Sequence, residues 1–106
     1  MAPHRSATKS AAINFSSSGD NTVVAAQTIG PVNVYGLFFT VAGATNIVFK
    51  DGSTALSGAV VLTGNGSAMT LQINDEPYFQ CQPGDAFVMN SSNAVAVTGT
   101  VYYTTG

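Results

Sequence analysis

The stretch PVNVYGLFFTVAGATNIVFKDG, residues 31–52, decides the fold class of this chain. Within residues 32–42 only Asn33 and Thr40 are polar, and no residue is charged. Alternate residues of a strand point to opposite faces, and both alternating sets are apolar here. We therefore expect a strand that is covered on both sides, by a second sheet on one side and by a neighbouring subunit on the other.

The same stretch predicts its own internal features. Gly36 indicates a bulge or a close backbone approach within the first strand. Gly43 and Ala44 predict a turn into a second strand at 45–50, so the two strands read as a hairpin. The first strand divides into two sets, with Tyr35, Leu37, Phe39 and Val41 on one side and Val34, Phe38 and Ala42 on the other. We expect Phe39 to face the core and Phe38 to face a partner.

Short apolar runs between Gly, Pro, Asn and Ser turns fill the rest of the chain, and none has a helical period. We expect strands from residue 11, at 22–29, 59–62, 68–73, 87–90 and 94–103, with an edge piece at 78–81 and a loop at 17–21. Asn65-Gly66 predicts a tight hairpin between its flanking strands. This pattern indicates an all-β, eight- to nine-stranded antiparallel β-sandwich, jelly-roll-like, over residues 11–106.

Length and composition restrict the function. The chain has 106 residues, which suits one domain, and only 8% are charged, against roughly a quarter in an average soluble domain. A surface so poor in charge favours an oligomer or a docked subunit. Residues 11–106 carry a net charge of −4, which argues against binding nucleic acid.

Residues 1–10 are small, polar and basic, with a charge of +2 from Arg5 and Lys9. Such a segment buries too little surface to order itself, so we expect a flexible N-terminal arm. Two interpretations remain open, a disordered tail or an arm that reaches the acidic body of a neighbouring subunit. The arm has no apolar run of signal-peptide length, and no segment approaches a membrane span.

The sequence offers no reaction chemistry. His4 is the single histidine, so no Ser-His-Asp or Cys-His arrangement is expected, and Cys81 is the single cysteine. Asp75-Glu76 reads as a solvated turn. Asp51 and Asp85 could hold calcium with loop carbonyls, but no EF-hand spacing supports this. We therefore expect no enzyme, no catalytic residue, no cofactor and no metal site, and we expect Cys81 to be a buried apolar residue.

Aromatic side chains are the remaining candidates for recognition. Tyr35, Tyr78, Phe79, Tyr102 and Tyr103 could form a sugar-stacking platform, but the chain has no Trp, which favours packing in a core or an interface. We expect the subunit or capsid interface to include Arg5, Lys9, Tyr35, Phe38, Tyr78, Phe79 and Tyr102.

Two motifs carry a family resemblance. They are Ser18-Gly19-Asp20-Asn21, followed by a Val-Ala strand, and FKDGSTAL at 49–56. With the segments 13–26, 34–66 and 76–103, the chain resembles small tailed-bacteriophage capsid decoration or cement proteins with a jelly-roll β-sandwich. The resemblance implies a homotrimer on the outer capsid surface that binds the major capsid protein and ties capsomers together, after synthesis in the host cytoplasm.

Two alternatives stay open beside the cement interpretation. The first is a tail-fibre, head-fibre or spike-associated β-domain that attaches to a host. The second is a carbohydrate-binding β-sandwich module with weak glycan binding. Neither nucleic acid nor a membrane is expected as a partner.

Overall fold

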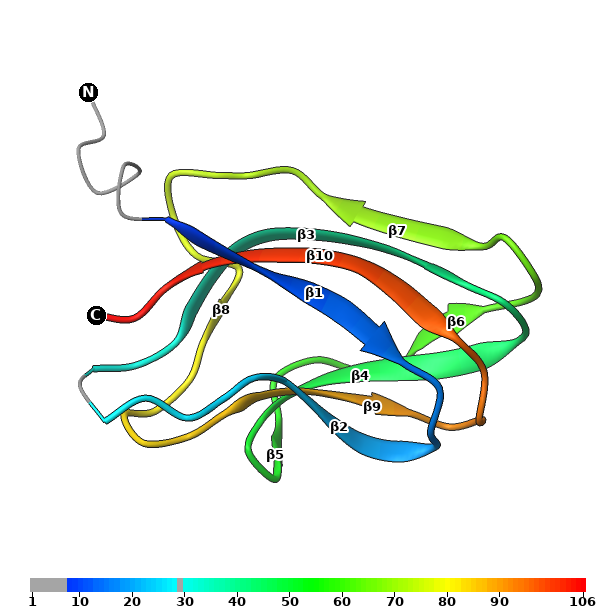
Figure 1. Cartoon of the computed structure of the whole chain (residues 1–106), viewed down its shortest axis with the longest axis horizontal. Coiled ribbons are helices and arrows are strands. Elements are labelled where there is room, and N and C mark those ends of the chain that lie inside the picture. Colours follow the sequence, from blue (N-terminus) through cyan, green and yellow to red (C-terminus); the bar gives the residue numbers. More distant parts are fainter. Residues whose placement is uncertain (1–7, 29) are drawn as a thin grey trace.

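A computed structural model describes residues 8–28 and 30–106 of the chain as two antiparallel sheets packed face to face (Figure 1). Sheet A has the order β1-β10-β3-β7, and β8 also pairs with β3. Sheet B has the order β2-β9-β4-β5, and β6 also pairs with β4. The strands are β1 (Lys9–Phe15), β2 (Gly19–Val24), β3 (Asn33–Val41), β4 (Thr45–Asp51), β5 (Thr54–Ala55), β6 (Val60–Leu62), β7 (Ala68–Leu71), β8 (Phe79–Gln80), β9 (Phe87–Ser91) and β10 (Val97–Thr104).

This strand order confirms the predicted fold class. The first four strands alternate between the sheets, so β1 and β3 lie in one sheet while β2 and β4 lie in the other. The chain then returns, and β10 inserts between β1 and β3 while β9 inserts between β2 and β4. Two sheets interleaved in this way form a jelly roll. Within the described ranges there is no helix that is long and apolar enough to cross a membrane.

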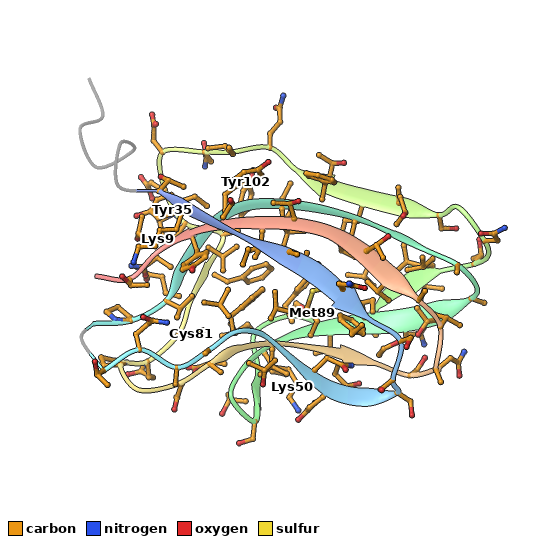
Figure 2. The ribbon with its side chains drawn as sticks, viewed as in Figure 1. Lys9, Tyr35, Lys50, Cys81, Met89 and Tyr102 are labelled. Atoms are coloured by element: carbon orange, nitrogen blue, oxygen red, sulfur yellow. The ribbon has the colours of Figure 1, made fainter. Side chains whose placement is uncertain are left out.

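The core lies between the two sheets. Its centre is aromatic: the Phe49 ring stacks on Phe79 at a centroid distance of 4.8 Å and meets Phe39 edge to face at 6.3 Å. Phe87 completes this cluster, with its centroid 6.1 Å from that of Phe49. Figure 2 shows Cys81 and Met89 also between the sheets, and both are buried. Cys81 is thus the buried residue that we expected.

Gly36 lies at the predicted irregularity in β3. Tyr102 pairs with Gly36 and Tyr103 pairs with Val34, so Tyr35 is an extra residue and β3 contains a bulge. A Cβ on Gly36 would lie 3.0 Å from the Ile73 backbone, which also confirms the close approach. The predicted division of the strand is correct for Phe38 and Phe39, but it is wrong before Gly36. Because the bulge shifts the alternation by one residue, Val34 is buried and Tyr35 is only partly buried.

Both predicted hairpins are wrong, although their turns form. β3 and β4 belong to different sheets, and so do β6 and β7. At the second turn, Ser67 N donates to Gly64 O, and Gly66 has a φ of 87°. No non-glycine among the described residues has a positive φ, so Asn65 does not adopt the conformation that a type I′ hairpin turn requires. The turn therefore directs the chain across to the opposite sheet.

Several strand boundaries also differ from the prediction. β2 covers Gly19–Val24 rather than residues 22–29, because Asp20 and Asn21 pair with β9 although their residue types favour loops. β1 begins at Lys9, so two residues of the expected arm pair with β10. The described residues form ten strands, whereas eight or nine were expected. The additional strand is β5, which forms a two-residue ladder inside the expected loop at 53–58.

Candidate interaction surface

The outer face of sheet A is a regular array of small and uncharged side chains. Cross-strand pairing aligns them in three rows, which we call the A face. The rows are Asn14-Thr98-Thr40-Ala68, then Ala12-Thr100-Phe38-Thr70, then Ser10-Tyr102-Gly36. None of these residues is charged, and the hydroxyls of Thr40 and Thr98 lie 3.5 Å apart. The A face therefore presents methyl groups, hydroxyls and aromatic carbon, without a charge that must be desolvated on contact.

Exposed apolar side chains are concentrated at one part of this array. Phe38 is 43% exposed in the central row, and Ile73 and Tyr78, in the β7–β8 connection, are 43% and 40% exposed. Ile73 packs over Gly36, which joins this connection to the third row. The Tyr78 hydroxyl donates to Gln72 O at 2.7 Å, so its ring is held in place while remaining accessible. Together these residues extend the A face past the bulge.

The outer face of sheet B has a different chemistry. Lys50 Nζ lies 2.9 Å from Asp20 Oδ1, and the Asn90 side chain donates to the same oxygen at 2.7 Å. These donors lower the pKa of Asp20, through the Asn90 amide first and the Lys50 ammonium second. Val88 faces outward between Thr22 and Lys50 but is only 5% exposed. We call this surface the B face, and its charged groups bond to one another.

Five of the seven predicted interface residues lie at or near the A face. Phe38 and Tyr102 belong to it, and Tyr35 lies in the adjoining bulge. Tyr78 lies in the β7–β8 connection. Figure 2 shows Lys9, Tyr35 and Tyr102 at the end of the sandwich where the chain terminates, and Lys9 Nζ lies 3.5 Å from Thr105 Oγ1.

The two remaining residues do not join this surface. Phe79 is partly buried and stacks on Phe49 and Phe87 in the aromatic cluster, so its ring supports the core rather than extending the A face. It lies there because β8 pairs with β3 at Val34. Arg5 lies outside the described residues.

Sequence reasoning missed the polar part of the surface. Thr40, Thr98 and Thr100 were assigned to strands but not to an interface, since threonine alone gives no recognition signal. The alternation of Thr with apolar residues in β10 places Thr98 and Thr100 on one side, but only the order β1-β10-β3-β7 brings them beside Thr40, Ala12 and Phe38.

A second feature lies at the end of β4. The Asp51 carboxyl is close enough to raise the pKa of Asp85, first through a hydrogen bond and then through like charge. Burial raises the pKa of the Cys81 thiol to about 11, with Asp51 and Asp85 adding to the effect. The described ranges contain no group of three or more His, Cys, Asp or Glu side chains placed to hold a metal ion.

A scan against models of known protein families gives no match for this chain, and a search of curated proteins gives none either.

Proposed function

We propose that this chain is a structural virion protein that decorates and stabilises an icosahedral phage capsid, with the A face as its principal docking surface. The observation that carries the proposal is the A face itself, which is uncharged throughout and includes a Phe38 side chain that is 43% exposed. The jelly-roll strand order and the resemblance of the quoted motifs to phage cement proteins support the same function.

The chemistry of the A face suits contact with another protein. Removing Thr, Ala, Phe and Tyr side chains from water costs less than removing charges, and interface cores are correspondingly poor in charge and rich in aromatic residues. The B face offers a poorer site, because a partner would have to desolvate the Asp20–Lys50 pair.

The dimensions of the A face suggest many weak contacts rather than one tight contact. Four strands about 4.8 Å apart, over five residues of β10, span a plane of roughly 200 Å². Stable complexes of two proteins bury roughly 800 Å² on each partner. The adjoining surface at Tyr35, Ile73 and Tyr78 must therefore contribute, and so must multivalency. A trimer bound to a capsid shell supplies this multivalency, because several weak contacts act together at high effective concentration.

The stabilising mechanism is mass action. A protein that binds the closed shell and not its loosened form raises the shell's stability by RT ln(1 + [L]/Kd). Particles of the source phage that lack this protein should release DNA at a lower temperature, and adding the purified protein should restore the original temperature. Identical release with and without the protein would overturn the proposal.

A matched pair of variants tests the surface. Phe38→Ser and Val61→Ser each remove an exposed apolar side chain, at 43% exposure on the A face and at 66% exposure on β6 of sheet B. Phe38→Ser should weaken binding to particles stripped of the protein by at least about tenfold, since aromatic anchors dominate interface energies. Val61→Ser should bind as the unaltered protein does.

Two further measurements separate the alternatives. Copies per particle in the hundreds support a shell protein, whereas a handful of copies would indicate a fibre or spike domain. Sugar binding at millimolar or tighter dissociation constants on a glycan array would favour the carbohydrate-binding alternative. The mass of the purified protein in solution tests the trimer.

A further inference from the structure

A carboxylate pair at the end of β4 lies in sheet B and plays no part in the proposed docking. Asp51, the last residue of β4, is only 7% exposed. Its Oδ2 accepts a hydrogen bond from Gln82 N at 3.0 Å, but its Oδ1 is buried without a hydrogen-bond partner. A buried acceptor that is left unpaired is rare in native proteins, and a proton, a water molecule or an ion can satisfy it.

The turn before β9 brings a second carboxyl beside that of Asp51. Asp85 N donates to Gln82 O, which closes the turn, and Gly52 N donates to Ala86 O at 2.8 Å, which fixes the turn against β4. A Cβ on Gly52 would lie 3.8 Å from Asp85 Cγ, so this carboxyl lies beside Asp51. The nearness of the Asp51 carboxyl also explains why the pKa of Asp85 is raised.

No described basic residue neutralises the two carboxylates. Lys50 precedes Asp51 on β4 but points to the opposite face, where it pairs with Asp20. Lys9, the first residue of β1 in the other sheet, lies beside Thr105. Cys81 is the other titratable group that interacts with the pair, and with a pKa of about 11 its thiol stays neutral. The two carboxyls thus lie side by side at the end of β4 without a described cation beside them.

We propose that Asp51 and Asp85 bind a divalent cation of the calcium type between β4 and the turn at 82–85. Calcium accepts six to eight oxygen ligands in a flexible geometry, so two carboxylates can be completed by water and main-chain carbonyls. Magnesium demands a stricter octahedron and gives up its water reluctantly, so it should bind more weakly. With two protein carboxylates, the dissociation constant should be on the order of 10⁻⁴ to 10⁻³ M. This inference is independent of the proposed function.

The test is thermal unfolding of the full chain at pH 7.5, after treatment with a chelator, across a calcium chloride titration. Calcium should raise Tm by roughly 5 °C at about ten times its dissociation constant, and the increase should saturate. Magnesium should give a smaller increase, and sodium chloride of equal ionic strength should give none. Isothermal titration with calcium chloride should find one site per chain.

Two variants decide the location. Asp85→Asn keeps the shape of a half-exposed residue, so it should fold and lose the calcium effect, whereas Glu76→Gln removes an exposed acid elsewhere and should keep it. A calcium effect that persists in Asp85→Asn would overturn the proposal. The proposal would also be overturned if calcium left Tm unchanged while Tm rose as the pH fell from 7.5 to 5. That result would mean that the carboxyl pair binds only a proton.

Discussion

The A face and the B face have the same strand geometry but opposite electrostatic character. On the A face the central strands β3 and β10 place Phe38, Thr40 and Thr100 outward, with no charge. On the B face the equivalent strands carry Lys50 and Asn90, and both bond to Asp20 on β2. A sandwich that needed only solubility would distribute its few charges over both faces. A partner that covered the A face would bury no charge, whereas one that covered the B face would bury the Asp20–Lys50 pair.

The largest expected effect tests whether the two sides of β3 have separate functions. Phe39→Ala should lower the free energy of unfolding by roughly 3–5 kcal/mol, because its ring is 1% exposed and packs on Phe49. Phe38→Ala should cost less than about 1 kcal/mol, since the side chain already meets water. Urea unfolding of both variants measures the two values. Equal losses would contradict the separation between core side and docking side.

The next effect tests how closely β3 and β10 must approach beneath the A face. A Cβ on Gly99 would lie 2.6 Å from Phe39 Cα and would overlap the Phe38 carbonyl oxygen. Gly99→Ala should therefore cost about 1–3 kcal/mol of unfolding free energy or more, through strand displacement. Gly58→Ala is the control, because nothing lies within 4 Å of its added Cβ. Near-equal stability of the two variants would show that the sheet tolerates a wider separation.

A charge placed on either face tests their difference directly. Thr40→Lys and Asn46→Lys alter exposed, outward residues on β3 and β4, the inner strands of the two sheets. Both should fold with changes within about 0.5 kcal/mol. Thr40→Lys should weaken particle binding by at least about tenfold, because a partner would bury an unpaired ammonium group. Particle-binding assays on both variants measure this, and equal binding would remove the distinction between the faces.

The smallest effect concerns the ion pair of the B face. Because the pKa of Asp20 is lowered in the folded state, its contribution to stability is complete above the unfolded value near 3.8 and is lost as the pH falls through the folded value. Asp20 is exposed, so Asp20→Asn should cost at most about 1 kcal/mol at pH 7. Unfolding of both proteins from pH 7 to pH 2 should show the difference vanishing at the acid end. A difference that stays constant with pH would show that the charge of Asp20 contributes no stability.

Much of the fold could be predicted because β-structure leaves a period of two in the sequence. Phe39 was expected to face the core from alternation, and its side chain is buried. The prediction failed where an added residue shifts the alternation, at the bulge that moves Tyr35 outward and Val34 inward. Alternation predicts which face each side chain points to only as far as the next bulge. A glycine such as Gly36 indicates a bulge, but it does not show which neighbouring residue is the unpaired one.

The candidate surface was predictable only in part. Phe38 was assigned to a partner-facing side because two apolar faces on one strand exceed what a single sandwich interior requires, and it is exposed. Phe79 was placed in the same surface from its residue type, yet it completes the core. The threonines gave no signal, because their contribution comes from their neighbours on other strands.

The sequence by itself determined an all-β chain of short strands, the inward side of most of them and a body with very few charges. Those properties follow from local alternation, turn residues and composition, which act over a few residues. Only the tertiary structure decided which strands are neighbours. Except for β5, the strands that pair with β3 or with β4 are separated from them in the sequence by other strands. No local sequence pattern encodes which of these strands pair. The uncharged A face arises from such long-range pairings and could not be derived from the order of residues alone. Asp51 and Asp85 could be named from the sequence as possible calcium ligands, but only the tertiary structure brings the two carboxyls together.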